Sequence, residues 1–157
     1  MAILKVVDGS YENIDAVDNL ICYIAERSEV AGGWGISMAS VTAIISEFKA
    51  VKRFWNKTGG RQIKHFIISW KAESSLNILQ MQYMAAYLTA YFHPEYQVFW
   101  GVHLDTDTPH IHIAVNTVSC STGKKLIFEK EDLTNYHIFI DNIVNKVRRE
   151  LHIKNYI

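Results

Sequence analysis

The stretch from Gly101 to Thr117, GVHLDTDTPHIHIAVNT, predicts a β-hairpin. After Pro109, branched apolar residues alternate with other residues, which is typical of a half-buried strand whose odd and even positions face opposite ways. The Asp-Thr-Asp-Thr-Pro segment before this run favours a turn, because aspartate bonds nearby backbone and proline fixes φ. The apolar set is expected to face the core: Ile111, Ile113 and Val115. The polar set is expected to share the other face: His110, His112 and Asn116.

A closed hairpin would bring a further histidine, His103, beside His110 and His112. Three neutral imidazoles that converge from adjacent strands can bind a divalent metal ion and leave positions open for a substrate. One alternative is that these histidines bind no ligand. Another is a structural zinc site, which usually closes its fourth position with cysteine or another histidine. Cys22 and Cys120 lie outside the pattern in sequence, so we expect a catalytic metal site at the three histidines.

Length and composition indicate one domain with a substantial core. The chain has 157 residues, of which 49% are hydrophobic and 12% aromatic, and its formal net charge is zero. No apolar run approaches the length of a membrane span, and the N-terminus lacks the layout of a signal peptide. Two isolated cysteines suit a reducing compartment. We therefore expect a cytoplasmic protein that does not insert into a membrane.

Apolar periodicity and turn residues predict the other elements. Strands are expected at Ala2–Val7, Gln62–Trp70, Tyr96–Leu104, Ile111–Val118 and Leu126–Phe128. Helices are expected at Ile14–Arg27, Ser40–Phe54, Leu76–Phe92 and Glu131–Leu151. The glycine-rich segment Ala31–Gly35 is expected to be a loop. This order predicts an α+β fold: a central antiparallel sheet with the hairpin in its middle, helices packed on one face and the other face free for a ligand.

A basic segment with embedded aromatic residues runs from Lys49 to Lys64, into the start of the second predicted strand. It contains six cations and no acid, with Phe54 and Trp55 among them. Such a surface can follow a nucleic-acid backbone and stack on single-stranded bases. The alternative is a solvated helix face whose aromatic residues belong to the core. The six cations are Lys49, Lys52, Arg53, Lys57, Arg61 and Lys64.

The histidine motif resembles the metal motif of plasmid relaxases, the mobilisation nucleases of the HUH endonuclease superfamily. The likeness extends upstream: GRQIKHFIISW at 60–70 resembles the second relaxase motif, and NLICYI at 19–24 resembles the helical segment that holds the nucleophilic tyrosine. The resemblance implies an HUH endonuclease-like fold and a single relaxase-like catalytic domain over residues 1–157. Relaxases usually continue beyond this length, so we expect either a domain truncated at its C-terminus or a minimal relative.

The resemblance implies a site- and strand-specific DNA nicking and joining activity in the mobilisation of plasmids or integrative elements. Tyr23 would attack a phosphodiester at an origin of transfer and remain joined to the 5′ phosphate. Because the ester conserves the energy of the bond, the strand could later be rejoined. The expected metal is Mn²⁺ or Mg²⁺, although imidazoles alone favour Zn²⁺ or Ni²⁺ in vitro. The implied partners are single-stranded DNA at the origin and accessory relaxosome proteins.

Other residues are expected to support this chemistry. His65 would help to deprotonate Tyr23 or contact a phosphate, or else have a structural role. Asp105 or Asp107 would hold an imidazole N–H group, or else only form the turn. Asn116 would bond backbone at the end of the hairpin or orient the substrate. Contacts with DNA are expected from Lys52, Arg53, Arg61, Lys64 and Ser69.

Some alternatives stay open at this point. Tyr11 is a rival nucleophile, although it lies in a predicted turn outside the tyrosine segment. The family commonly follows its tyrosine with a basic, threonine-containing stretch, whereas Ala25–Glu29 is mixed in charge. A rolling-circle replication initiator shares the histidine and tyrosine chemistry but carries its tyrosine after the histidines. A relaxase-like module that binds DNA without cutting it is the third alternative.

Overall fold

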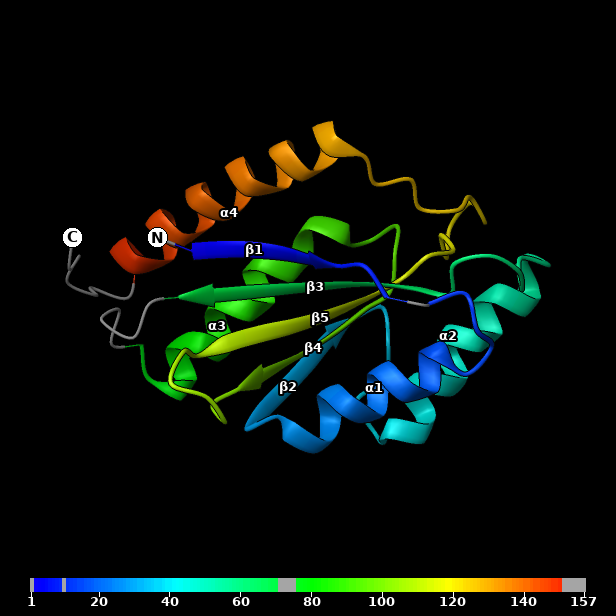
Figure 1. Ribbon diagram of the computed structural model, residues 1–157, viewed down its shortest axis with the longest axis horizontal. Helices are drawn as coiled ribbons and strands as arrows, with labels where there is room; N and C mark the ends of the chain where they lie inside the picture. Colours follow the sequence, from blue (N-terminus) through cyan, green and yellow to red (C-terminus); the bar gives the residue numbers. More distant parts are fainter. Residues whose placement is uncertain (1, 10, 71–75, 151–157) are drawn as a thin grey trace.

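The computed structural model describes residues 2–9, 11–70 and 76–150. Figure 1 shows a five-stranded antiparallel sheet in the order β1-β3-β5-β4-β2, together with four α-helices. The strands are β1 (Ala2–Val7), β2 (Val30–Trp34), β3 (Ile63–Trp70), β4 (Val98–His103) and β5 (His110–Asn116). The helices are α1 (Ala16–Arg27), α2 (Val41–Phe54), α3 (Ile78–Thr89), the 3-10 turn η2 (Ala90–Phe92) and α4 (Lys130–Glu150). The predicted α+β class and the central position of the hairpin in an antiparallel sheet are confirmed.

Local sequence explains where two of the helices begin. The Ser40 side chain accepts a hydrogen bond from the Ala43 amide and so caps α2. Asn77 and Gln80 form a reciprocal capping box at the start of α3. Helix α1 begins at Ala16, two residues after the predicted Ile14. The predicted end of the last helix, Leu151, lies outside the described residues.

The sheet separates two hydrophobic cores, and each core is covered by helices. On one face, Ile111, Ile113 and Val115 pack with residues of α3 and α4. On the other face, Phe99 and Ala114 pack against α1 and α2. The expectation that the helices pack on one face is therefore wrong. Its physical reason is that α1 and α2 also carry apolar stripes that need burial: Val17, Leu20, Ile21, Ile24, Ile44 and Phe48.

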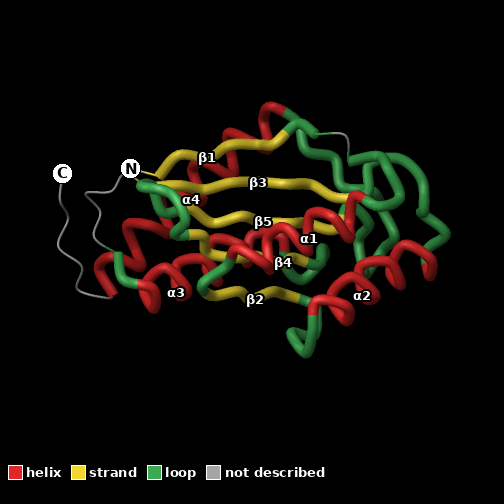
Figure 2. The backbone as a smooth tube through the Cα atoms, turned by 60° about the horizontal axis from the view of Figure 1, so that its bottom comes forward, coloured by secondary structure: helices red, strands yellow, loops and turns green. Residues whose placement is uncertain are grey.

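Helix α1 covers only part of its face of the sheet, because it contacts β4 and β5 (Figure 2). The register places Lys5, Ile67 and His112 on this same face. Lys5 is exposed and Ile67 half-buried, whereas His112 is buried. The histidine face of the sheet is therefore covered over β4 and β5 and more open over β1 and β3.

Two local predictions are wrong. The glycine-rich segment expected to be a loop is the edge strand β2, which pairs with β4 from Val30↔Val102 to Trp34↔Val98. A Cβ on Gly32 would collide with the indole of Trp100, so this glycine serves a close packing contact rather than a turn. Leu126–Phe128 forms no strand in the described structure, and the nearest pairing is an isolated bridge between Val118 and Lys125. Because β3 and β4 already flank β5 on both sides, this segment cannot pair with β5 as a further strand.

Among the described helices, none combines the length and the apolar character that crossing a membrane requires.

Candidate metal centre and nuclease site

Three histidine side chains converge at the closed end of the β4–β5 hairpin. His103 is the last residue of β4 and pairs directly with His110, the first residue of β5. His112 lies two residues further on, and its ring centroid is 4.3 Å from that of His103. One ring nitrogen from each of the three residues lies within 4.8 Å of the other two. The predicted convergence of the imidazoles is confirmed, whereas metal binding stays a prediction.

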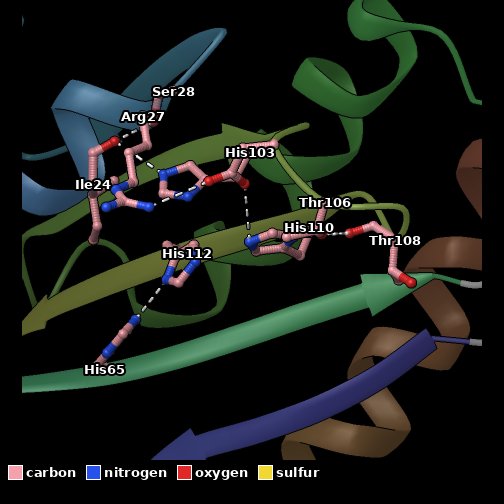
Figure 3. Close-up of polar contacts among 10 residues, drawn as sticks. Ile24, Arg27, Ser28, His65, His103, Thr106, Thr108, His110 and His112 are labelled. Atoms are coloured by element: carbon pink, nitrogen blue, oxygen red, sulfur yellow. Dashed lines mark hydrogen bonds and ion pairs between the residues drawn. The ribbon is translucent and has the colours of Figure 1, made fainter.

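Backbone carbonyls determine which nitrogen two of these rings can offer to a metal (Figure 3). The Nε2–H of His103 donates to the carbonyl of Ile24 at 3.0 Å, which leaves Nδ1 as its lone-pair nitrogen. That Nδ1 is buried and has no hydrogen-bond partner among the described residues. The Nδ1–H of His110 donates to the carbonyl of Thr108 at 2.9 Å, which leaves Nε2. A buried lone pair without a donor is costly, and a divalent ion would satisfy it, so this donor set fits a metal.

The third ring, His112, begins a buried chain of hydrogen bonds. Its Nδ1 lies 2.8 Å from the Nε2 of His65, and the Nδ1 of His65 lies 2.8 Å from the hydroxyl of Tyr11. Both ring nitrogens of His65 therefore form hydrogen bonds, one with His112 and one with Tyr11, and neither is directed at the phenol of Tyr23. This arrangement fits an orienting role for His65 better than that of a base for Tyr23.

The buried rings of this cluster are neutral at physiological pH. Burial, reinforced by the neighbouring His103, lowers the pKa of His65 to about 4. The same two causes, together with His65 itself, lower the pKa of His112 to about 3. Burial also lowers the pKa of His103. Because only a neutral imidazole can ligate a metal, His103 and His112 are ready to bind an ion without first losing protons.

Tyr23 projects from α1 onto this cluster. Its ring centroid lies 5.4 Å from that of His112 and 5.8 Å from that of His103, and the residue is 38% exposed. The helix can approach β4 closely because Gly101 has no side chain. A Cβ at this position would collide with Ser28 and Ile24 of the helix end. Helix, glycine and hairpin together place a solvent-accessible phenol beside the three imidazoles.

Arg27 is a residue of this site that the sequence did not single out. Its guanidinium carbon lies 5.1 Å from the centroid of the Tyr23 ring, and its Nη1 lies 3.5 Å from Oδ2 of Asp105. The spacing of four residues from Tyr23 on a helix is the signal that could have found it. Oδ1 of Asp105 lies 4.0 Å from Nε2 of His110. Asp105 thus approaches the nitrogen that His110 could offer to a metal, whereas the Nδ1–H that was expected to bond an aspartate donates to the carbonyl of Thr108.

The other expected site residues are spread over both faces. Ser69 pairs in register with His110 and shares its face. The guanidinium carbon of Arg61 lies 5.9 Å from the centroid of the Tyr11 ring. Lys64 lies on the opposite face, with its ammonium 5.8 Å from the centroid of the Phe128 ring. The remaining two are exposed, one on α2 and one in the hairpin turn: Arg53 and Asp107.

Lys52 and Asn116 form a buried polar junction instead of a DNA contact. The ammonium of Lys52 donates to the Gln62 carbonyl at 2.6 Å and to Oδ1 of Asn116 at 2.7 Å. Burial lowers the pKa of Lys52 to about 7. The amide of Asn116 donates to the Phe48 carbonyl at 3.1 Å, which fits the structural alternative for this residue. The expected surface position of Lys52 is wrong, because four residues after Phe48 it lies on the buried stripe of α2.

Comparisons with known proteins agree with this site. Two curated proteins of Staphylococcus aureus, both called protein rlx, are similar to the chain. One is 32% identical over 88 residues, which cover 56% of this chain and 26% of the relative. The other is 29% identical over 119 residues, which cover 76% of this chain and 36% of the relative. The chain thus spans about a quarter to a third of the length of these relatives.

A solved structure described as the molecular basis of vancomycin resistance transfer in Staphylococcus aureus has a similar fold. Its TM-score is 0.58 at 13% identity, over 82% of this chain and 73% of that chain. A family model described as relaxase, MobA/VirD2-like, nuclease domain matches residues 23–149, which begin at Tyr23 and include all three histidines of the cluster. The chain therefore belongs to the MobA/VirD2-like relaxases, as the histidine motif indicated.

Proposed function

We propose that this chain is a metal-dependent DNA relaxase that nicks one strand at an origin of transfer through a covalent bond between Tyr23 and a 5′ phosphate, and later rejoins it. The observation that carries the proposal is the position of the Tyr23 ring, 5.4 Å from His112 and 5.8 Å from His103. A nucleophile and a three-nitrogen cluster on one sheet face are the two groups that a phosphoryl transfer requires.

In this mechanism the phenolic oxygen of Tyr23 bonds to phosphorus while the bond from phosphorus to the 3′ oxygen breaks. The phenol's proton passes to solvent, which reaches this half-exposed side chain, and a proton returns to the departing 3′ oxygen. An ion held by His103, His110 and His112 would neutralise the negative charge that develops on the phosphate. Arg27 would add a second positive charge beside the phenol, since a guanidinium can bind two phosphate oxygens at once. Reversal of these steps rejoins the strand.

Two properties of the site bear on its ion and its DNA. Neutral nitrogen ligands favour Zn²⁺ or Ni²⁺ in vitro, whereas Mn²⁺ or Mg²⁺ is the ion that membership of the relaxase family implies. The single strand would lie beside the cluster over β1 and β3, where Lys5 is exposed and Ser69 shares the face of His110. Accessory relaxosome proteins would bring the enzyme to its origin DNA.

A trapping experiment with randomised DNA tests the proposal even while the sequence of the origin is unknown. The purified chain is incubated with Mn²⁺ and a pool of labelled single-stranded oligonucleotides, and complexes that survive denaturation in detergent are sequenced. We expect the parent protein to trap one sequence preferentially. Tyr23→Phe should trap none, whereas Tyr87→Phe, on the opposite side of the sheet, should behave like the parent.

The outcomes separate the alternatives. A stable adduct in Tyr23→Phe that is lost in Tyr11→Phe would reassign the nucleophile to Tyr11. If the parent retains oligonucleotides only non-covalently, the chain is a DNA-binding module and the proposed activity is wrong. If chelation of metal leaves the yield of adduct unchanged, the role proposed for the three histidines is wrong.

A further inference from the structure

A chain of hydrogen bonds leads from the histidine cluster to a second tyrosine. It runs from His112 through His65 to Tyr11, with two contacts of 2.8 Å each. His112 and His65 are 3% and 4% exposed, so water does not compete for these bonds. Tyr11 is half-buried and precedes residue 23, where the match to the relaxase family begins. The proposed cleavage reaction assigns no role to the hydrogen bonds that link His112 to Tyr11.

An ion on His112 would fix the direction of every bond in the chain. Because Nδ1 of His112 faces His65, the ion would take the other nitrogen, Nε2, and Nδ1 would then carry the proton. This Nδ1–H donates to Nε2 of His65, so His65 carries its own proton on Nδ1. That second N–H donates to the oxygen of Tyr11. The hydroxyl of Tyr11 then accepts from within the protein, and its own proton is free to point outward.

Without an ion, both directions remain possible. His112 can carry its proton on Nε2, in which case Nδ1 accepts from His65 and Tyr11 donates inward to His65. In that arrangement the hydroxyl proton of Tyr11 is used inside the protein. Metal loading therefore selects the arrangement in which Tyr11 is a donor toward solvent.

A cation lies over the ring of Tyr11. The guanidinium carbon of Arg61 lies 5.9 Å from the centroid of the Tyr11 ring. Its Nη1 is buried and has no hydrogen-bond partner within the described part of the chain. Burial raises the pKa of Tyr11, which keeps the hydroxyl protonated and able to donate. A hydroxyl donor beside a guanidinium with an unused N–H is a pair that recognises a phosphate oxygen.

We propose that Tyr11 and Arg61 form a phosphate-binding subsite for the DNA strand, and that metal binding at His112 switches Tyr11 into its donating orientation through His65. The subsite would hold a phosphodiester other than the one that is cut. It rests on the proposed function, because it assumes the same ion and the same substrate. Its consequence is that the metal increases DNA affinity through a protein hydrogen bond as well as through its own charge.

Binding measurements in the Tyr23→Phe background test this subsite in the absence of cutting. The affinity for a fluorescent dT oligonucleotide is measured by anisotropy with Mn²⁺ and with EDTA. We expect Tyr11→Phe to weaken binding about tenfold with Mn²⁺ and less than about twofold with EDTA. The reason is that the hydroxyl of Tyr11 donates to the charged phosphate only in the metal-loaded protein, so the substitution removes that hydrogen bond only there. Arg61→Gln should weaken binding in both conditions. Tyr87→Phe is the matched control and should change neither.

A second measurement detects the protons of these hydrogen bonds directly. Long-range ¹H–¹⁵N NMR spectra of the Zn²⁺-loaded protein should show protons on Nδ1 of both His112 and His65. A proton on Nε2 of His65 in that state would overturn the proposal. Equal affinities of Tyr11→Phe and its parent with Mn²⁺ would also overturn it, as would an equal loss with and without metal. These results leave the covalent adduct of the Tyr23 protein untouched, so the two proposals fail separately.

Discussion

The buried histidines should make this protein unusually sensitive to mild acid. The perturbation is a change from pH 7.5 to pH 5 in metal-free buffer. Folding lowers the pKa of His65 from its ordinary 6.5 to about 4, and that of His112 to about 3. A group with a depressed folded pKa stabilises the native state above its unfolded pKa, and this stabilisation is lost as the pH falls toward the folded pKa. The sensitive window therefore runs from about pH 6.5 down to pH 3–4.

The size of the effect follows from the same values. At pH 5 the unfolded chain has bound nearly one proton at each of these two positions, and the folded chain almost none. Each ring then destabilises the native state by about 2 kcal/mol, or about 4 kcal/mol for the pair. The hydrogen bond between the two rings couples the two losses. A loss of this size is a large part of the stability of a typical domain.

Urea unfolding at intervals between pH 7.5 and pH 5 measures this loss as a shift of the midpoint at constant slope. His65→Gln should remove about half of the pH dependence, because one titrating ring is gone. His137→Gln, which replaces a half-exposed histidine of α4, is the matched control and should retain it. A parent protein whose free energy of unfolding changes by less than about 1 kcal/mol over this range would refute the reasoning.

Three further outcomes are expected. Zn²⁺ at about a hundred times its Kd should stabilise the fold by about 2.7 kcal/mol, which raises Tm by roughly 5–10 °C, and His110→Ala should abolish the shift in a thermal melt. Gly101→Ala should lower the free energy of unfolding by about 1–3 kcal/mol and reduce the yield of DNA adduct, because the added Cβ moves α1. Gly59→Ala is the control, since its added Cβ meets open space, and it should change the stability by less than about 0.5 kcal/mol. Equal effects of the two substitutions would contradict the packing argument. Arg27→Gln should slow adduct formation at nearly unchanged stability, because its ion pair is exposed. Arg27→Lys should restore little of that rate, and a full recovery would show that only the charge matters.

The hairpin could be predicted because its signals are local. A period of two in Ile111–Val115, with an aspartate- and proline-containing turn before it, determines both the strand and the face of each side chain. The same alternation predicted which histidines converge. The helices were predicted from periods of three and four, with ends displaced by a few residues.

The remaining features depend on partners that are distant in sequence. Gly32 lies in a strand that pairs with β4, and the indole of Trp100 occupies the place where a side chain at this position would lie. Lys52 can be buried because the oxygens of Gln62 and Asn116 accept hydrogen bonds from its ammonium. His65 contacts a histidine that lies 47 positions away. No local pattern contains such information, and this is why the orienting role of His65 needed the structure.

Strand β1 has a practical consequence for anyone who shortens this protein. It pairs with β3 along its full length, from Ala2↔Trp70 to Val7↔His65, yet it lies ahead of the segment that matches the relaxase family. A recombinant fragment trimmed to residues 23–149 would strip that neighbour away and divide α1. The strand that carries His65 and Ser69 would become a bare rim with open amide and carbonyl groups, which invites stacking with other molecules. Such a fragment should precipitate, and the loss of its activity would reveal nothing about its chemistry.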